Sequence, residues 1–232
     1  WTEYLSNPVP DLKLPLDKER PKYRTFACEV LEVSFEDELL AKAKEFSGKQ
    51  KVSLNHTLLS IFEIFLSSWT QQKDIVVGLP VAGQLLMNKP SLIGHCVHLL
   101  PLRSRINPNQ TFAEYLQDRR KAYNQTLDHQ AISFGSMVQD LQIKRDPSRI
   151  PLIPITFNID MGMDKTLSFK DLDHRLISNP KAYANFEIII NLFGSANENV
   201  FVWTYNKDLF DEYSIAAAGT RYISFIEKIL LN

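Results

Sequence analysis

The stretch DIVVGLP, from Asp74 to Pro80, is the clearest indication of the fold in this sequence. Its apolar residues follow one another without alternation, and glycine and proline mark its end. This pattern is typical of a short strand that is buried on both faces. Such a strand needs further layers against it, so the stretch predicts a sheet with helices packed on it.

The sequence on both sides of this strand supplies the other elements. The clearest helix covers 55–69, where Leu58, Phe62, Phe65 and Trp69 form one apolar face. Hydrophobic spacing predicts the remaining helices at about 35–47, after a capping box at Ser34, and at 111–128, 133–142 and 215–229. It predicts strands at 25–33, 96–105, 152–159, 184–193 and 199–206. The mixed order of strands and helices indicates the α/β class, with a mixed β-sheet.

Four prolines near the N-terminus, Pro8, Pro10, Pro15 and Pro21, exclude a regular helix there. We therefore divide the chain into a Pro-rich strap at 1–24, extended over a surface, and an α/β lobe at 25–232.

The composition excludes several function classes. The 232 residues include 26 Lys and Arg against 27 Asp and Glu, a formal charge of −1, so no long-range field attracts nucleic acid or an anionic membrane. Two distant cysteines, Cys28 and Cys96, give neither a disulfide framework nor zinc-ligand spacing. No export signal or membrane-length apolar run is visible, and we expect a cytoplasmic protein.

The segment His95-Cys96-Val97-His98 is the one place where potential metal ligands crowd together. On a strand, Cys96 and His98 would share one face. A zinc site would need two further ligands from elsewhere, so metal binding is the minor alternative. An imidazole here either forms an interior hydrogen bond or lines a cleft, and residue type alone favours the interior role.

Two other segments have alternative interpretations. The segment from Gly78 through Pro80 and Val81 to Gly83 lacks phosphate-loop spacing, so it is either a tight turn or a loop that lines a pocket. The segment RDPSR, which ends at Arg149, is typical of a hydrogen-bonded corner. A buried arginine usually has fixed partners, so we expect Arg149 to hold this corner rather than contact substrate. No nucleophile signature is present, and these residues alone indicate only an α/β domain.

Four collinear segments carry a resemblance to a known family. They are DIVVGLPVAGQ (74–84), LIGHCVHLLPLRSR (92–105), HQAISFGSMVQDL (129–141) and RDPSRIPLIPITFNID (145–160). Together they resemble the condensation domains of nonribosomal peptide synthetases, and weaker similarity extends to both ends of the chain. The sequence GHCV…LLPLR is most similar to the corresponding segment of condensation domains from hybrid polyketide and peptide assembly lines. The chain departs from the family because it has no HHxxxDG motif, and because His98 stands where the family usually has Asn.

The resemblance implies the C-terminal lobe of such a domain, with a chloramphenicol-acetyltransferase-like fold. It implies an N-terminal lobe as partner, with donor and acceptor carrier proteins that deliver substrates on phosphopantetheine, and no cofactor bound by the chain itself. No catalytic residue is expected here. A latch is expected within 160–183, and the 78–84 loop is expected on the cleft floor. The resemblance places these residues along the substrate tunnel: His98, His95, Gly78, Pro80, Val81, Gly83, Asn158 and Arg149.

Within this interpretation, His98 orients the acceptor amine or shapes its pocket. Two other functions stay open at this stage. The chain is alternatively a lobe of a related acyltransferase that forms esters from coenzyme A or carrier-bound acyl groups. It is otherwise a noncatalytic module that docks carrier proteins.

Overall fold

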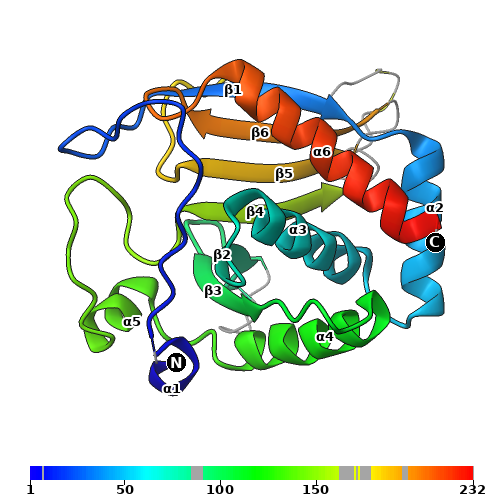
Figure 1. Ribbon diagram of the computed structural model, residues 1–232, viewed down its shortest axis with the longest axis horizontal. Helices are drawn as coiled ribbons and strands as arrows, with labels where there is room; N and C mark the ends of the chain where they lie inside the picture. The colour runs from blue at the N-terminus through cyan, green and yellow to red at the C-terminus, as the bar shows by residue number, and fades with distance from the viewer. Residues whose placement is uncertain are drawn as a thin grey trace.

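A six-stranded mixed sheet forms the centre of the molecule, in the order β1-β6-β5-β4-β2-β3 (Figure 1). The computed structural model describes residues 1–6, 8–84, 91–161, 170, 172, 179–194 and 198–231. The strands are β1 (Cys28–Ser34), β2 (Asp74–Ala82), β3 (Val97–Arg105), β4 (Ile155–Met161), β5 (Ile188–Gly194) and β6 (Asn199–Asn206). β4 is parallel to both β2 and β5, whereas the other pairs are antiparallel.

The long helices lie on one side of this sheet. The helices are α1 (Thr2–Leu5), α2 (Asp37–Lys49), α3 (Leu54–Thr70), α4 (Phe112–Asp128), α5 (Phe134–Asp140) and α6 (Glu212–Leu231). α3 contacts β2 and β4, α6 contacts β1 and β6, and α4 contacts β3. Figure 1 shows α3 and α6 in front of the strands. None of the helices in the described ranges is long and apolar enough to cross a membrane.

Aromatic side chains fill the space between the helices and the sheet. Phe62 of α3 stacks on Phe157 of β4 with ring centroids 5.1 Å apart, and it meets Tyr222 of α6 edge-on at 5.3 Å. Phe201 and Trp203 of β6 are fully buried in the same layer. Because these residues recur at helical spacing on the helices and at alternate positions on the strands, one apolar core forms between the two layers.

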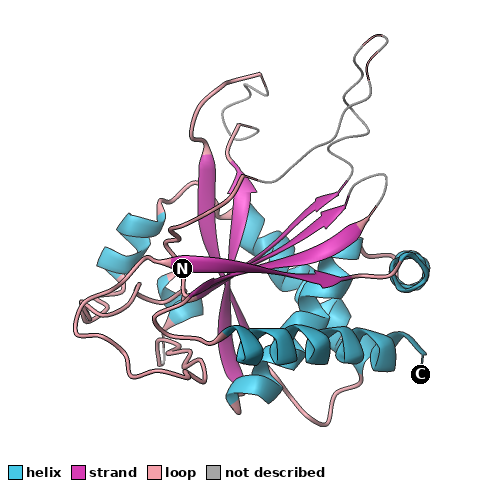
Figure 2. Ribbon diagram, turned by 90° about the horizontal axis from the view of Figure 1, so that it is seen from above, coloured by secondary structure: helices cyan, strands magenta, loops and turns pink. Residues whose placement is uncertain are grey.

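The opposite face of the sheet is not covered by any of the described helices along β4, β5 and β6. Strand register and alternation place on it Asn158, Asp160, Ile189, Asn191, Phe193, Val200 and Val202, all of which are half-buried. None of the described helices packs on this part of the sheet, as Figures 1 and 2 show. We call these seven residues the helix-free face.

The N-terminal strap crosses the ends of the strands (Figure 1). Arg103 at the end of β3 donates hydrogen bonds to three strap carbonyls, those of Tyr4, Ser6 and Pro8. Farther along the strap, Arg20 forms a bidentate pair with Glu187 at 2.9 Å. The strap begins with the short helix α1, which the Pro-rich pattern did not predict, and continues as an extended segment. Side chains and backbone of the lobe hold this extended part at several points, because it has no helix or sheet bonds of its own.

The predicted helices and strands are all present, with shifts at their ends. The predicted strands 152–159 and 184–193 begin at Ile155 and Ile188, later than expected. The backbone before β4 is turned, since Ile153 N donates to Pro151 O at 2.7 Å. Pro154 has no backbone N–H to donate to a neighbouring strand, and its carbonyl accepts from Glu187 N at 2.9 Å. The prolines therefore explain why the first of these strands begins later than predicted.

A buried ion pair links the helical layer to the sheet and to the strap. Glu63 of α3 is fully buried and accepts two hydrogen bonds from the guanidinium of Arg119 in α4, both 2.7 Å long. The Tyr115 hydroxyl donates a third bond to Glu63 at 2.7 Å. Arg119 also donates to the carbonyl of Arg103, which in turn accepts from the Tyr4 hydroxyl at 2.8 Å. Burial raises the pKa of Glu63, opposed by Arg119.

The replacement Arg119→Met should destabilise the fold by about 3–5 kcal/mol, because it leaves the Glu63 carboxylate buried and uncompensated. Urea unfolding measures this loss. Lys121→Met is the matched control, since Lys121 lies on the same helix with a side chain that is 77% exposed. The control should change stability by less than about 1 kcal/mol. Similar losses for the two variants would contradict the structural role of the buried pair.

Candidate functional site

The predicted loop at 78–84 is mostly a strand. Gly78, Pro80 and Val81 lie in β2, which pairs with β3 as far as Ala82, and only Gly83 and Gln84 form a turn. The expectation of a loop over the whole segment is therefore wrong. Pro80 has no N–H to donate, so it fits only where one side of the strand needs no partner. Beyond Gly78, where β2 pairs with β4, the strand continues beside β3 alone, and Pro80 lies in that part.

Gly78 and Gly83 are both required by close packing. A Cβ atom at Gly78 would lie 2.5 Å from Ile153 Cγ2. At Gly83 it would lie 2.5 Å from the carbonyl oxygen of Cys96 and 2.8 Å from the His98 ring. The Gly83 amide donates to that same carbonyl at 2.7 Å. The absence of a side chain thus lets the end of β2 lie against the start of β3.

His98 lies on the side of β3 that faces the helices. It shares this side with Ser104, which bonds the Tyr115 hydroxyl of α4 at 2.5 Å. Its Nδ1 lies 3.0 Å from the carbonyl oxygen of Gln130, just after α4, and its ring contacts the Gly83 backbone region. A carbonyl can only accept, so Nδ1 carries a proton. Two of the residues predicted along the tunnel, Gly83 and His98, therefore lie together at one end of the sheet.

His95 and Cys96 precede β3. The side chain of His95 is exposed and that of Cys96 is half-buried as a free thiol. Across the part of the chain that the structure describes, no three His, Cys, Asp or Glu side chains gather where a metal ion would fit. The pair of Cys96 and His98 therefore has no third ligand among those residues.

Arg149 lies beside the strap. Its guanidinium donates to the Asp11 carboxylate at 3.0 Å and to the Leu12 carbonyl at 2.7 Å. The corner before it is closed by Asp146, whose carboxylate accepts from the Ser148 amide and hydroxyl. These Ser148 bonds hold the pKa of Asp146 below its usual range. Arg149 thus fastens the strap to the 145–149 corner.

Asn158 is the predicted residue that lies on the helix-free face. Its side-chain amide donates to Asp160 Oδ2 at 3.0 Å, and the amide of Asn191 on β5 donates to the same oxygen at 2.9 Å. Asp160 ends the FNID segment, but its sequence context indicates no role for it, and no sequence motif points to Asn191. No local signal joins these residues, because the pairing of β4 with β5 is what brings them together.

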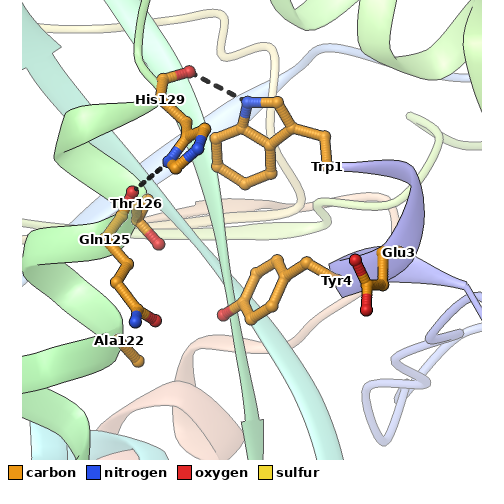
Figure 3. A pocket seen from close by; sticks show the side chains of 7 residues that line it. All are labelled: Trp1, Glu3, Tyr4, Ala122, Gln125, Thr126 and His129. Carbon is orange, nitrogen blue, oxygen red and sulfur yellow. Dashed lines mark hydrogen bonds between the residues drawn. The ribbon is translucent and has the colours of Figure 1, made fainter.

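A hollow of about 420 Å³ lies elsewhere, between α1 and α4 (Figure 3). Its wall consists of Trp1, Glu3, Tyr4, Ala122, Gln125, Thr126 and His129. The Trp1 indole donates to the His129 carbonyl at 2.9 Å, and His129 Nδ1 lies 2.8 Å from the Gln125 carbonyl. The Trp1 bond attaches the first helix to the end of α4, whereas the His129 ring bond lies within the end of α4 itself. Most of the predicted latch at 160–183 lies outside the described residues.

The comparisons with known proteins decide the family. A family model described as Condensation domain matches residues 1–232. The chain belongs to the condensation domain family. Among curated relatives, this condensation domain is 28% identical to tyrocidine synthase 3 of Brevibacillus parabrevis over 229 residues, and 26% identical to the polyketide synthase PksN of Bacillus subtilis over 236 residues. Each alignment covers 99% of the chain but 4% of the relative.

Solved structures share the fold of this condensation domain. The X-domain from teicoplanin biosynthesis superposes with a TM-score of 0.87 at 16% identity, over 100% of this chain and 53% of that one. The first condensation domain of the CDA synthetase superposes with a TM-score of 0.77 at 18% identity, over 91% of this chain and 46% of that one. The predicted fold, a mixed sheet with helices packed on it in a chloramphenicol-acetyltransferase-like lobe, is confirmed. The chain spans about half of each of these structures.

Gly83→Ala should destabilise the domain by about 1–3 kcal/mol, because the added methyl group cannot fit against the Cys96 carbonyl and the His98 ring. Gly48→Ala is the matched control in α2, where nothing lies within 4 Å of the added Cβ. There alanine should stabilise the fold by up to about 1 kcal/mol. Chemical denaturation of both variants checks the opposite signs, and a stabilising Gly83→Ala would refute the close packing.

Proposed function

We propose that this chain is the C-terminal lobe of a nonribosomal peptide synthetase condensation domain, and that it works with an N-terminal lobe supplied by another part of the protein. The main support is the family match over residues 1–232 together with the coverage of about half of each compared structure. A second support is the sequence, in which no two histidines are adjacent, so the HHxxxDG motif is absent from this chain.

The proposed reaction joins two tethered substrates in a tunnel between the lobes. The amine of an aminoacyl thioester attacks the carbonyl carbon of a donor acyl thioester. A C–N bond forms, the C–S bond breaks, and the thiol of the donor carrier leaves with one proton from the amine. Holding both reactants in place makes the step nearly intramolecular, which can lower its barrier by roughly 7–11 kcal/mol. This lobe contributes one wall of the tunnel and is inactive alone.

The proposed partners are the N-terminal lobe and the donor and acceptor carrier proteins. Phosphopantetheine on the carriers holds both substrates, and the chain binds no cofactor of its own. Of the residues assigned to the tunnel, Gly83 and His98 lie at one sheet end and Asn158 on the helix-free face. Arg149 acts through the strap, whose Asp11 and Leu12 it binds.

A condensation assay with loaded donor and acceptor carriers tests the proposal. The chain alone should give no amide product, whereas the chain mixed with a separately expressed N-terminal lobe should give product. Product is measured by mass spectrometry of the acceptor carrier. Product from the chain alone would refute the proposal that it is a lobe that needs an N-terminal partner. An ester from a hydroxyacyl acceptor, with no amide from an aminoacyl acceptor, would favour an ester-forming acyltransferase. Carrier binding without any turnover in the mixture would favour a docking module.

His98→Ala should lower turnover in the intact protein by about tenfold or more, because the variant loses the imidazole that joins the start of β3 to the Gln130 carbonyl. His98→Asn retains a side-chain donor and should recover part of the activity. The exposed Lys121, which is not among the assigned tunnel residues, provides the control Lys121→Met, which should leave turnover within about twofold. Melting temperatures are measured in parallel. Full turnover by His98→Ala would exclude a tunnel role for this residue.

A further inference from the structure

The helix-free face holds one carboxylate, and its position is fixed. Asp160 Oδ2 accepts from two carboxamides, Asn158 Nδ2 at 3.0 Å and Asn191 Nδ2 at 2.9 Å. Asn158 and Asn191 are direct neighbours in the pairing of β4 with β5. Because all three side chains stand on regular strands of one sheet, the carboxylate is held rigidly.

Both donors of this cluster bind the same oxygen of Asp160. The described residues supply no hydrogen bond to Oδ1, and they form no ion pair with this carboxylate. An ionised carboxylate offers about four acceptor positions on its two oxygens. Among the described residues, the Asp160 carboxylate is therefore an acceptor that still has room for donors.

Asn191 provides a second, independent sign of a missing donor. Its Oδ1 is buried and has no hydrogen-bond partner in the part of the chain that the structure describes. The orientation of this amide is fixed, because the Asp160 carboxylate can only accept and so must face the NH₂ group. A buried acceptor without a donor costs about 1–3 kcal/mol, so a group that donates several hydrogen bonds would be stabilised here.

The surroundings favour a small cation over a neutral donor. Apolar side chains flank the cluster on the same face, namely Ile189 and Phe193 of β5 and Val200 and Val202 of β6. All four are half-buried. A charge-assisted hydrogen bond in such a partly dehydrated setting is roughly twice as strong as a neutral one.

We propose that Asp160, held by Asn158 and Asn191, binds the amino group of the acceptor aminoacyl thioester. This inference rests on the proposed function, which supplies the amine. The carboxylate binds the acceptor as its ammonium form through N–H donors, and loss of one proton to solvent gives the amine that attacks the donor thioester. Asp160 takes no proton in the bond-forming step, so its role is to bind the substrate and to select an amine as the nucleophile.

The test replaces Asp160 in the full-length protein. Asp160→Asn keeps the size of the side chain and removes its charge, so KM for the aminoacyl carrier should rise about 10- to 100-fold, the range of one charge-assisted hydrogen bond. KM for the donor carrier should stay within about twofold. Asp160→Glu keeps the charge but moves it by one methylene group, and its acceptor KM should rise less.

Glu32→Gln is the matched control. Glu32 lies on β1, exposed, and its register with Val202 places it on the same side of the sheet, so this substitution removes one charge outside the cluster. Its acceptor KM should stay within about twofold of wild type. A hydroxyacyl acceptor is a further control substrate, because it has no ammonium group. Its KM should change less than about threefold in Asp160→Asn.

The outcomes separate the two proposals. Wild-type protein that forms no amide would refute the proposed function itself. Wild-type activity together with an acceptor KM that is unchanged in both Asp160 variants would refute only the binding role of Asp160. A fall in kcat and in melting temperature with an unchanged acceptor KM would assign Asp160 a structural role and would likewise overturn the inference.

Discussion

The buried pair of Glu63 and Arg119 is the constraint on which the arrangement of layers depends. Removing both charges from water is costly, and the pair is tolerated because nearly every donor and acceptor in it is satisfied, including those of Tyr115 and the Arg103 carbonyl. These bonds require α3, α4 and the end of β3 to stand in one relative position. The hydroxyl of Tyr4 extends the same network to the first turn of the chain.

From this network the strap follows a path fixed by side chains of the lobe. Arg103, which contributes its carbonyl to Arg119, uses its own guanidinium to bind Asp74 and the first strap carbonyls. Arg149 and Arg20 continue the attachment toward β5. An extended Pro-rich segment has no internal hydrogen bonds, so these arginines replace what a helix or strand would supply.

The two faces of the sheet differ in what covers them. One face is covered by α3 and α6 and contains the stacked aromatic core, where Phe62 meets Phe157. The other face, along the three strands β4, β5 and β6, has half-buried apolar residues around Asn158, Asp160 and Asn191. Since successive residues of a strand point to opposite faces, Phe157 builds the core while Asn158 lies on the helix-free face, where we propose that the acceptor amine binds.

The α/β class, the elements from β1 to α6 and the family could all be predicted from the sequence, because hydrophobic periodicity and turn residues act locally and the four motifs are short and collinear. The short helix α1 could not, because the prolines that follow it indicate an extended segment. It also indicated the corner at Arg149, since Asp146 and Ser148 bond within a few residues. Two contacts become visible only in the folded structure: Asp160 binds Asn191, 31 residues away, and Glu63 binds Arg119, 56 residues away. Strand register and helix packing create these contacts, and neither is encoded in a local pattern.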